Sequence, residues 1–257
     1  MMNEDHYKWT YENADEFGVF PTNAVTVAHR GPMSKGVFEI PGMPEFNPMM
    51  LLHGEESVTF VKPLMPDTKY RVNETIADMQ DKGSGALMIA DSTISEVDSG
   101  DVAAVVRSGI FIRGMGGFGH KGTVKNVYPA LPKRNPDMVK EEVTDSNQAF
   151  LYRLNGDKNP LHVDPQMAAM GNFDKPIFHG LGFFGVTARS IQGHFCKDSA
   201  DDMLSFSSRF VGHVFPGETL IVAAWKEADT VIFGVKTKER GKPVIQGFAT
   251  LKPQAKL

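Results

Sequence analysis

The sequence has a single cysteine, Cys196, among its 257 residues. One thiol cannot form a disulfide within the chain, so the sequence favours a reducing compartment, or an organelle in which disulfides do not form. We expect Cys196 to be a packed helix residue and not a nucleophile.

The sequence also lacks long apolar runs and an excess of positive charge. No run approaches the roughly eighteen residues of a membrane span, and the polar residues 1–10 lack the apolar core of a secretory signal. Lys and Arg number 27 against 31 Asp and Glu, which gives a net charge of -4. A basic face for nucleic acid is therefore not implied, and we expect neither nucleic acid nor a membrane as partner.

One glycine-rich stretch, residues 114–119, fits the pattern G-x-G-x-x-G of dinucleotide-binding loops. That function needs a helix directly after the loop, because the phosphates bind at the helix N-terminus. Gly122 and the three prolines between residues 129 and 136 disfavour a long helix here. We therefore predict no nucleotide, other cofactor or metal, and interpret residues 114–136 as the connection between two halves.

Three long runs, residues 70–79, 86–97 and 102–112, have the β-branched and apolar character of strands. The turns between them, residues 81–85 and 98–101, contain Asp, Ser and Gly, which are good hairpin signals. The pattern predicts an antiparallel meander.

Three other segments receive shorter assignments. Residues 37–40 are predicted to form a short strand within a loop rich in Gly and Pro. Residues 49–54 are assigned to a helix, and residues 139–154 are also expected to be helical.

An internal repeat divides the chain, which at 28.3 kDa is long enough for one large domain or two small ones. In each copy a strand, a turn with proline and a long β run follow in the same order, 150 residues apart. The matching residues are Phe60, Val61, Pro66 and Val72 in the first copy and Phe210, Val211, Pro216 and Val222 in the second. The repeat predicts two copies of one sheet.

A helix is predicted to follow His179. Its apolar residues lie at helical spacing, while Gly182 and Gly185 would allow close approach to a sheet. These apolar residues are Leu181, Phe184, Ala188 and Ile191. The simplest interpretation is a buried core helix, which is compatible with a sheet wrapped around it.

The most informative stretch is residues 152–169, Tyr-Arg-Leu-Asn-Gly-Asp-Lys-Asn-Pro-Leu-His-Val-Asp-Pro-Gln-Met-Ala-Ala. Pro160 suits the first turn of a helix, with Asn159 as its cap. His162 then lies in that turn and Asp157 in the loop before it. Such a junction can aim a carboxylate and an imidazole at one small molecule, for which water is the candidate. The alternative is that Asp157 and His162 serve only capping and packing.

The length of the motif favours the functional interpretation. Residues 152–168 resemble the signature of the hydratase 2 family, the MaoC-like (R)-specific enoyl-CoA hydratases, and residues 173–181 are similar to the family's next segment. The matching residues of the first segment are Tyr152, Leu154, Gly156, Asp157, Asn159, Pro160, Leu161, His162 and Ala168. The resemblance implies an α+β double hot-dog fold, with each antiparallel sheet around a central helix.

The resemblance also implies two domains and one reaction. Residues 1–130 would form an N-terminal hot-dog repeat that binds acyl-CoA without a catalytic motif, and residues 131–257 the catalytic repeat. The implied reaction is hydration of trans-2-enoyl-CoA to (R)-3-hydroxyacyl-CoA in fatty-acid β-oxidation. The resemblance further implies a homodimer.

The site residues follow from the same resemblance. Asp157 and His162 are expected to hold the water and pass its protons. Gly180 is expected to donate its backbone N–H to the thioester oxygen. Asn159 is assigned to substrate binding as the residue that orients the Asp157 loop, with capping alone as the alternative. His179 is left outside the catalytic set, because a histidine before such a helix is as often a hydrogen-bonded packing residue.

Two other functions are compatible with a fold that binds CoA esters. A hot-dog acyl-CoA thioesterase would hydrolyse them, although the Asn-Pro-Leu-His element at residues 159–162 is typical of the hydratases. A non-catalytic acyl-CoA binding protein would only hold them.

The sequence ends in Ala255-Lys256-Leu257, which is similar to the C-terminal Ser-Lys-Leu read by the peroxisomal import receptor. Alanine keeps a small residue before the basic and apolar ones. These three residues predict binding to that receptor and a peroxisomal location. The alternative is a solvated tail without a function of its own.

Overall fold

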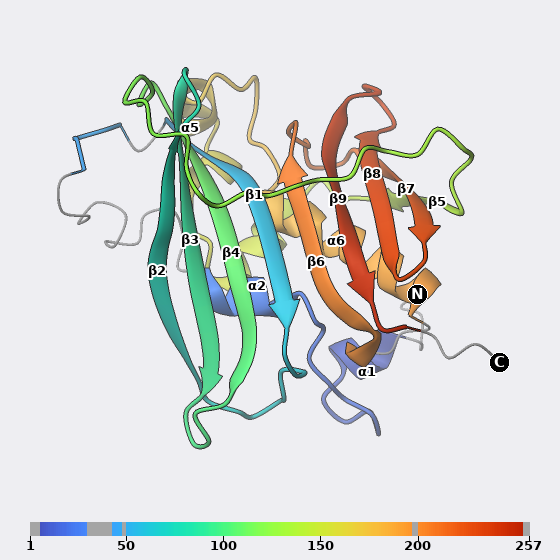
Figure 1. Cartoon of the computed structure of the whole chain (residues 1–257). Helices are drawn as coiled ribbons and strands as arrows, with labels where there is room; N and C mark the ends of the chain where they lie inside the picture. Colours follow the sequence, from blue (N-terminus) through green and yellow to red (C-terminus); the bar gives the residue numbers. More distant parts are fainter. Residues whose placement is uncertain (1–5, 30–42, 48–49, 197–199, 254–257) are drawn as a thin grey trace.

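The computed structural model describes residues 6–29, 43–47, 50–196 and 200–253, and in these ranges the strands form a single antiparallel sheet (Figure 1). The strand order is β2-β3-β4-β1-β6-β9-β8-β7-β5. The strands are β1 (Leu51–Phe60), β2 (Tyr70–Asp81), β3 (Gly85–Glu96), β4 (Val102–Arg113), β5 (Met138–Val143), β6 (Met203–Phe210), β7 (Thr219–Glu227), β8 (Thr230–Thr237) and β9 (Pro243–Leu251).

The two halves of the sheet meet where β1 pairs with β6. Ser57 lies opposite Ser207, which is 150 residues further along the chain, and the pairs on either side are Glu56 with Ser208 and Val58 with Phe206. Ser57 is therefore paired with its own equivalent, and a local twofold axis at this pair exchanges the pairs on either side. The predicted sequence repeat therefore corresponds to the two symmetry-related halves of the sheet.

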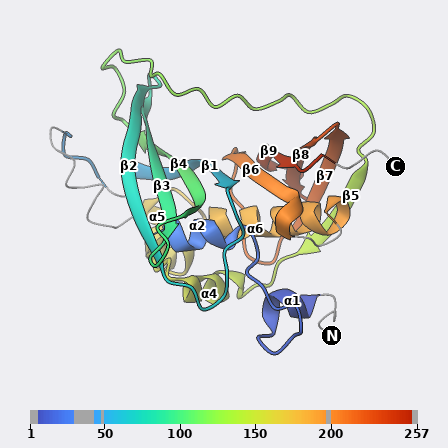
Figure 2. The same ribbon diagram turned by 60° about the horizontal axis from the view of Figure 1, so that its bottom comes forward.

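The helices lie on one face of the sheet (Figure 2). The longest, α6, contributes Phe184 and Ile191 to the core, and Phe184 packs edge to face on Phe206 of β6 at 4.8 Å. The helices are α1 (Tyr7–Thr10), α2 (Asn23–Ala28), α4 (Gln148–Tyr152), α5 (Pro165–Met170), α6 (Gly180–Phe195) and the 3-10 turns η3 (Arg153–Asn155), η4 (Pro160–His162) and η5 (Ala200–Asp202). None of the described helices is long and apolar enough to cross a membrane.

The predicted α+β double hot-dog fold and the helix after His179 are confirmed. The two halves are unequal, however. The second half wraps the sixteen residues of α6, whereas the first half has the six-residue α2 packed against β3 and β4.

The helix predicted at residues 49–54 is wrong, and the predicted strand cannot be compared. The helix predicted at residues 139–154 is right only for its second part, where Gln148–Tyr152 form α4 and Arg153–Asn155 form η3. Residues 51–54 belong to β1 and not to a helix. Residues 138–143 form β5, which pairs with β7 and buries Met138 and Glu142. Residues four positions apart lie on the same face of a helix and also on the same face of a strand. The spacing alone therefore could not distinguish the two. The predicted strand at residues 37–40 lies outside the described residues.

The connection between the halves crosses the sheet on the face opposite the helices (Figures 1 and 2). Its glycine-rich stretch is bound to β2, because Asp81 accepts hydrogen bonds from the backbone N–H of Gly117 at 3.0 Å and of Gly119 at 2.6 Å. These bonds hold the pKa of Asp81 at about 2. The backbone N–H groups of Gly117 and Gly119, which a phosphate would need, are thus hydrogen-bonded to a carboxylate of the same chain. Residues 114–137 contain no helix, which a dinucleotide-binding loop would need directly after it.

Candidate active site

The loop between η3 and η4 carries Asp157. Gly156 ends η3 with a positive φ of 109°, a conformation that glycine adopts without strain. The carboxylate of Asp157 then accepts the backbone N–H of Asn159 at 3.1 Å, and the side chain of Asn159 accepts that of Leu161 at 3.1 Å. Asn159 therefore caps η4, with Pro160 as its first residue. The capping predicted from the sequence is present, and it fixes the loop that holds Asp157.

His162 lies in η4, as predicted, and only 8% of it is exposed. Its Nδ1 lies 2.8 Å from the carbonyl oxygen of Ile177. A carbonyl only accepts, so Nδ1 carries the proton and Nε2 keeps a free lone pair. Burial lowers the pKa of His162, although the Ile177 carbonyl and Asp157 oppose it. His162 is therefore a neutral imidazole at neutral pH, with a basic nitrogen available.

His179 lies beside this pair, which the sequence interpretation did not anticipate. Its ring stacks on that of His162 with 3.7 Å between centroids, and its Nε2 lies 4.0 Å from Oδ2 of Asp157. Only 1% of His179 is exposed, and neither ring nitrogen has a hydrogen-bond partner in the described part of the chain. Burial, with the neighbouring His162, lowers its pKa to about 3. His179 therefore belongs to the site.

Asp157 differs from both histidines because it keeps its charge. Burial alone would raise its pKa, but His29, 3.5 Å away, and the N–H of Asn159 outweigh burial and hold the pKa well below the usual range of a carboxyl group. The site therefore combines a carboxylate with two neutral imidazoles. This is a suitable environment for moving protons, because it contains both an anion and a basic nitrogen.

Asp157, His162 and His179 also have the side-chain types of a metal site, with ligand atoms within 4.8 Å of one another. The stacking of the two rings disfavours a metal, because a histidine directs its lone pair in the plane of its ring. With centroids 3.7 Å apart and planes only 28° from parallel, the two rings cannot both have one ion between them in their planes. The geometry favours proton transfer over metal binding.

Gly180 is the first residue of α6, so its N–H is one of the donors without a partner inside the helix. A long helix also favours negative charge at this end. A Cβ at this position would lie 3.4 Å from Cε1 of Phe210, so a methyl group would just fit. The structure thus brings Gly180 and the predicted Asp157, Asn159 and His162 to one cavity.

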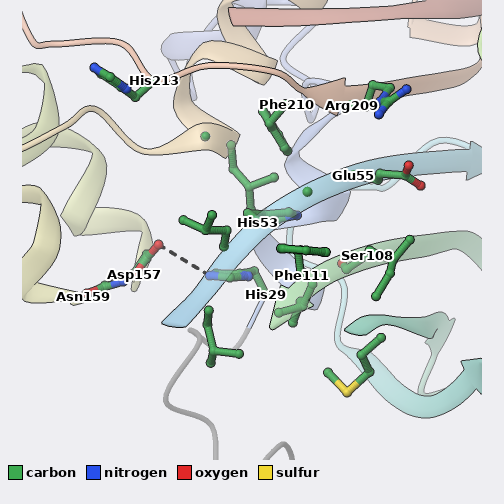
Figure 3. A pocket seen from close by; sticks show the side chains of 18 of the residues that line it. His29, His53, Glu55, Ser108, Phe111, Asp157, Asn159, Arg209, Phe210 and His213 are labelled. Atoms are coloured by element: carbon green, nitrogen blue, oxygen red, sulfur yellow. Dashed lines mark hydrogen bonds and ion pairs between the residues drawn. The ribbon is translucent and has the colours of Figure 1, made fainter. Parts of the chain in front are cut away.

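This cavity has a volume of about 820 Å³ and lies between the two halves. Leu87, Met88 and Phe111 of the first half line it together with Asp157 and Phe210 of the second. Figure 3 shows His29 and His53 of the first half pointing into the same space as Asp157. Neither histidine was identified from the sequence, where the only available sign was the His-Gly pair at residues 53 and 54, which resembles the pair at 179 and 180.

The fold and site define a double hot-dog protein with an Asp–His pair at the start of its central helix, and the comparisons with known proteins agree. Residues 2–114 match the MFE-2 hydratase 2 N-terminal domain and residues 127–247 the MaoC like domain. The chain belongs to the MaoC-like hydratase 2 family.

Named relatives extend over nearly the whole chain. The peroxisomal enoyl-CoA hydratase 2 of Arabidopsis thaliana is 36% identical, over 98% of this chain and 84% of that protein. The peroxisomal multifunctional enzyme type 2 of Mus musculus is 38% identical over 95% of this chain, which spans only 33% of that enzyme. The crystal structure of a MaoC-like dehydratase from Phytophthora capsici superimposes with a TM-score of 0.86 at 35% identity, over 97% of this chain and 87% of that one.

Proposed function

We propose that this chain hydrates trans-2-enoyl-CoA to (R)-3-hydroxyacyl-CoA in fatty-acid β-oxidation. The observation that carries the proposal is the placement of Asp157 and His162 in one cavity with the N-terminus of α6. The relatives named enoyl-CoA hydratase 2 support the same reaction. The site has the base, the anion and the N–H donor that addition of water across the double bond of an enoyl thioester requires.

The reaction begins with a water bound between the Asp157 carboxylate and Nε2 of His162. As the water oxygen forms a bond to C3, His162 takes one of its protons, and the charge of Asp157 stabilises the resulting imidazolium. The electron pair of the double bond moves onto the thioester, whose oxygen accepts the N–H of Gly180. A proton then returns to C2, which completes the addition of water and restores neutral His162.

The two repeats divide the work in this proposal. Residues 131–257 supply the reacting groups, and residues 1–130 bind the acyl group through the wall formed by Leu87, Met88 and Phe111. Asn159 acts by fixing the loop of Asp157, since its side chain is bound to the N–H of Leu161.

A single assay tests the function. The chain is incubated with crotonyl-CoA and with a longer trans-2-enoyl-CoA, while the loss of enoyl absorbance and the release of free thiol are followed. We expect loss of the enoyl absorbance without release of thiol, and a product of R configuration by chiral chromatography. Release of thiol would identify a thioesterase, and binding without any turnover would identify an acyl-CoA binding protein.

The location is tested separately, since Ala255, Lys256 and Leu257 lie outside the described residues. We expect a fluorescent reporter that ends in the last residues of this chain to enter peroxisomes through the import receptor. The same reporter without Leu257 should stay in the cytosol. A diffuse signal from both reporters would contradict the assignment.

A further inference from the structure

His29 belongs to the first half of the chain but contacts Asp157, one of the reacting groups of the second half. It ends α2, where its backbone N–H donates to the carbonyl oxygen of Val25 at 2.9 Å. Its Nε2 lies 3.5 Å from Oδ2 of Asp157 (Figure 3), and this buried nitrogen has no closer hydrogen-bond partner in the part of the chain that the structure describes. The contact is an ion pair, slightly longer than a hydrogen bond.

His29 is surrounded by acidic groups from several elements. Glu56 of β1 is 1% exposed, and its carboxylate is hydrogen-bonded to Nε2 of His53 at 2.8 Å. The ring of His53 is stacked on that of His29, with 6.3 Å between the ring centroids. The negative charge of Glu74 in β2 also raises the pKa of His29. The facing groups are therefore the carboxylates of Asp157, Glu56 and Glu74 and the imidazoles of His53 and His162.

The balance of these groups favours a charged His29. Burial lowers the pKa of His29, but the ion pair with Asp157 outweighs burial, and Glu56 and Glu74 act in the same direction. The pKa is therefore raised, so the imidazolium persists to a higher pH than in a free histidine. His162 is neutral under the same conditions, because burial outweighs the opposing effects of the Ile177 carbonyl and Asp157 on its pKa.

We propose that His29 is a positioning residue, whose imidazolium holds the Asp157 carboxylate ionised and in place for the water. The proposal rests on the role of Asp157 in the proposed hydration. It assigns to the first half a part in the reaction itself, in addition to binding the acyl group. The ion pair also spans the interface between the two halves, so the site is complete only when both are present.

The pH dependence follows from the signs of these shifts. Activity needs both the Asp157 carboxylate and neutral His162, so it is lost as the pH falls and either group is protonated. The charge of His29 lowers the pKa of both groups, and in both burial is the largest other influence: it raises the pKa of Asp157 and lowers that of His162. Because an opposite charge at this distance shifts a carboxyl pKa by about 1 to 3 units, the acidic limb of kcat/KM should move upward in His29→Gln.

The kinetic test compares His29→Gln, which keeps a side-chain N–H but no charge, with His29→Ala. On the acidic limb of the profile we expect kcat/KM of His29→Gln to fall on the order of tenfold below the wild type, equivalent to a shift of about one pKa unit, with little change in kcat or KM at neutral pH. Added imidazole should restore part of the activity of His29→Ala. The matched control is His194→Gln, since His194 is exposed on α6 and does not line the cavity. An equal loss at every pH in His29→Gln would overturn the proposal, because a purely structural role gives that result.

A second measurement does not depend on turnover. In the full chain labelled with ¹⁵N-histidine, the resonance missing from His29→Gln identifies His29, and its titration gives the pKa directly. We expect Asp157→Asn to lower this pKa by about 1 to 3 units. If the pKa of His29 were the same in Asp157→Asn as in the wild type, the proposed ion pair would be wrong. If the wild-type chain fails to hydrate enoyl-CoA but the titration shifts, the proposed function fails while the ion pair is retained.

Discussion

Replacing Asp157 with asparagine is expected to lower kcat for enoyl-CoA hydration by a factor of about 10² to 10⁴, the usual contribution of acid–base catalysis. Asparagine keeps the size of the side chain and can still accept the N–H of Asn159, so the loop should retain its shape. It removes the charge that stabilises the imidazolium of His162. The measurement is kcat with crotonyl-CoA at saturating concentration, with circular dichroism to compare the folds.

Asp164→Asn is the matched control for this change. Asp164 lies seven residues further along the same segment and caps α5 by accepting the N–H of Gln166 at 2.8 Å. Asparagine caps helices as well as aspartate does, and Asp164 does not line the cavity. We expect Asp164→Asn to retain wild-type turnover. If Asp157→Asn did so too, the carboxylate would have no part in the reaction.

His162→Ala belongs to the same prediction because the two groups act on one water. We expect a loss of similar size, and the double variant should be little worse than either single one, since residues that act as a unit are not additive. Alanine leaves the Ile177 carbonyl without its buried donor, so some loss of stability is expected as well. Thermal melting separates that loss from the loss of turnover.

The part of the site that was predictable from the sequence is the part encoded locally. Asp157, Asn159 and His162 lie within six residues, and Pro160 fixes the turn that joins them. Gly180 was expected from the family resemblance, and the predicted helix places it at the helix start. The roles of these residues remain predictions, whereas their placement in one cavity is a property of the structure.

His29 and His53 could not be found in this way, because they are more than a hundred residues from Asp157 in the sequence. Only the pairing of β1 with β6 and the packing of α2 beneath the sheet bring them to the cavity. His179 was excluded for a related reason. A histidine before a helix is as often a hydrogen-bonded packing residue, and only the fold brings its ring against that of His162.

Gly180→Pro is expected to reduce kcat by about 10² to 10³, the usual effect of removing one oxyanion-hole donor. The change deletes the N–H of Gly180 but suits the backbone, because proline is favoured at the first position of a helix. The preceding residue, His179, already has φ -56° and ψ 134°, the extended conformation that proline requires before it. The variant therefore tests the donor with little disturbance of α6.

Gly180→Ala provides the comparison, since it adds a methyl group but keeps the N–H. The nearest atom to that methyl would be Cε1 of Phe210 at 3.4 Å, an ordinary contact distance, so the loss of turnover should be much smaller than in Gly180→Pro. Both variants are assayed with crotonyl-CoA, and both should melt close to the wild type. Small and equal losses would remove Gly180 from the oxyanion role, and the thioester oxygen would then need another donor at the start of α6.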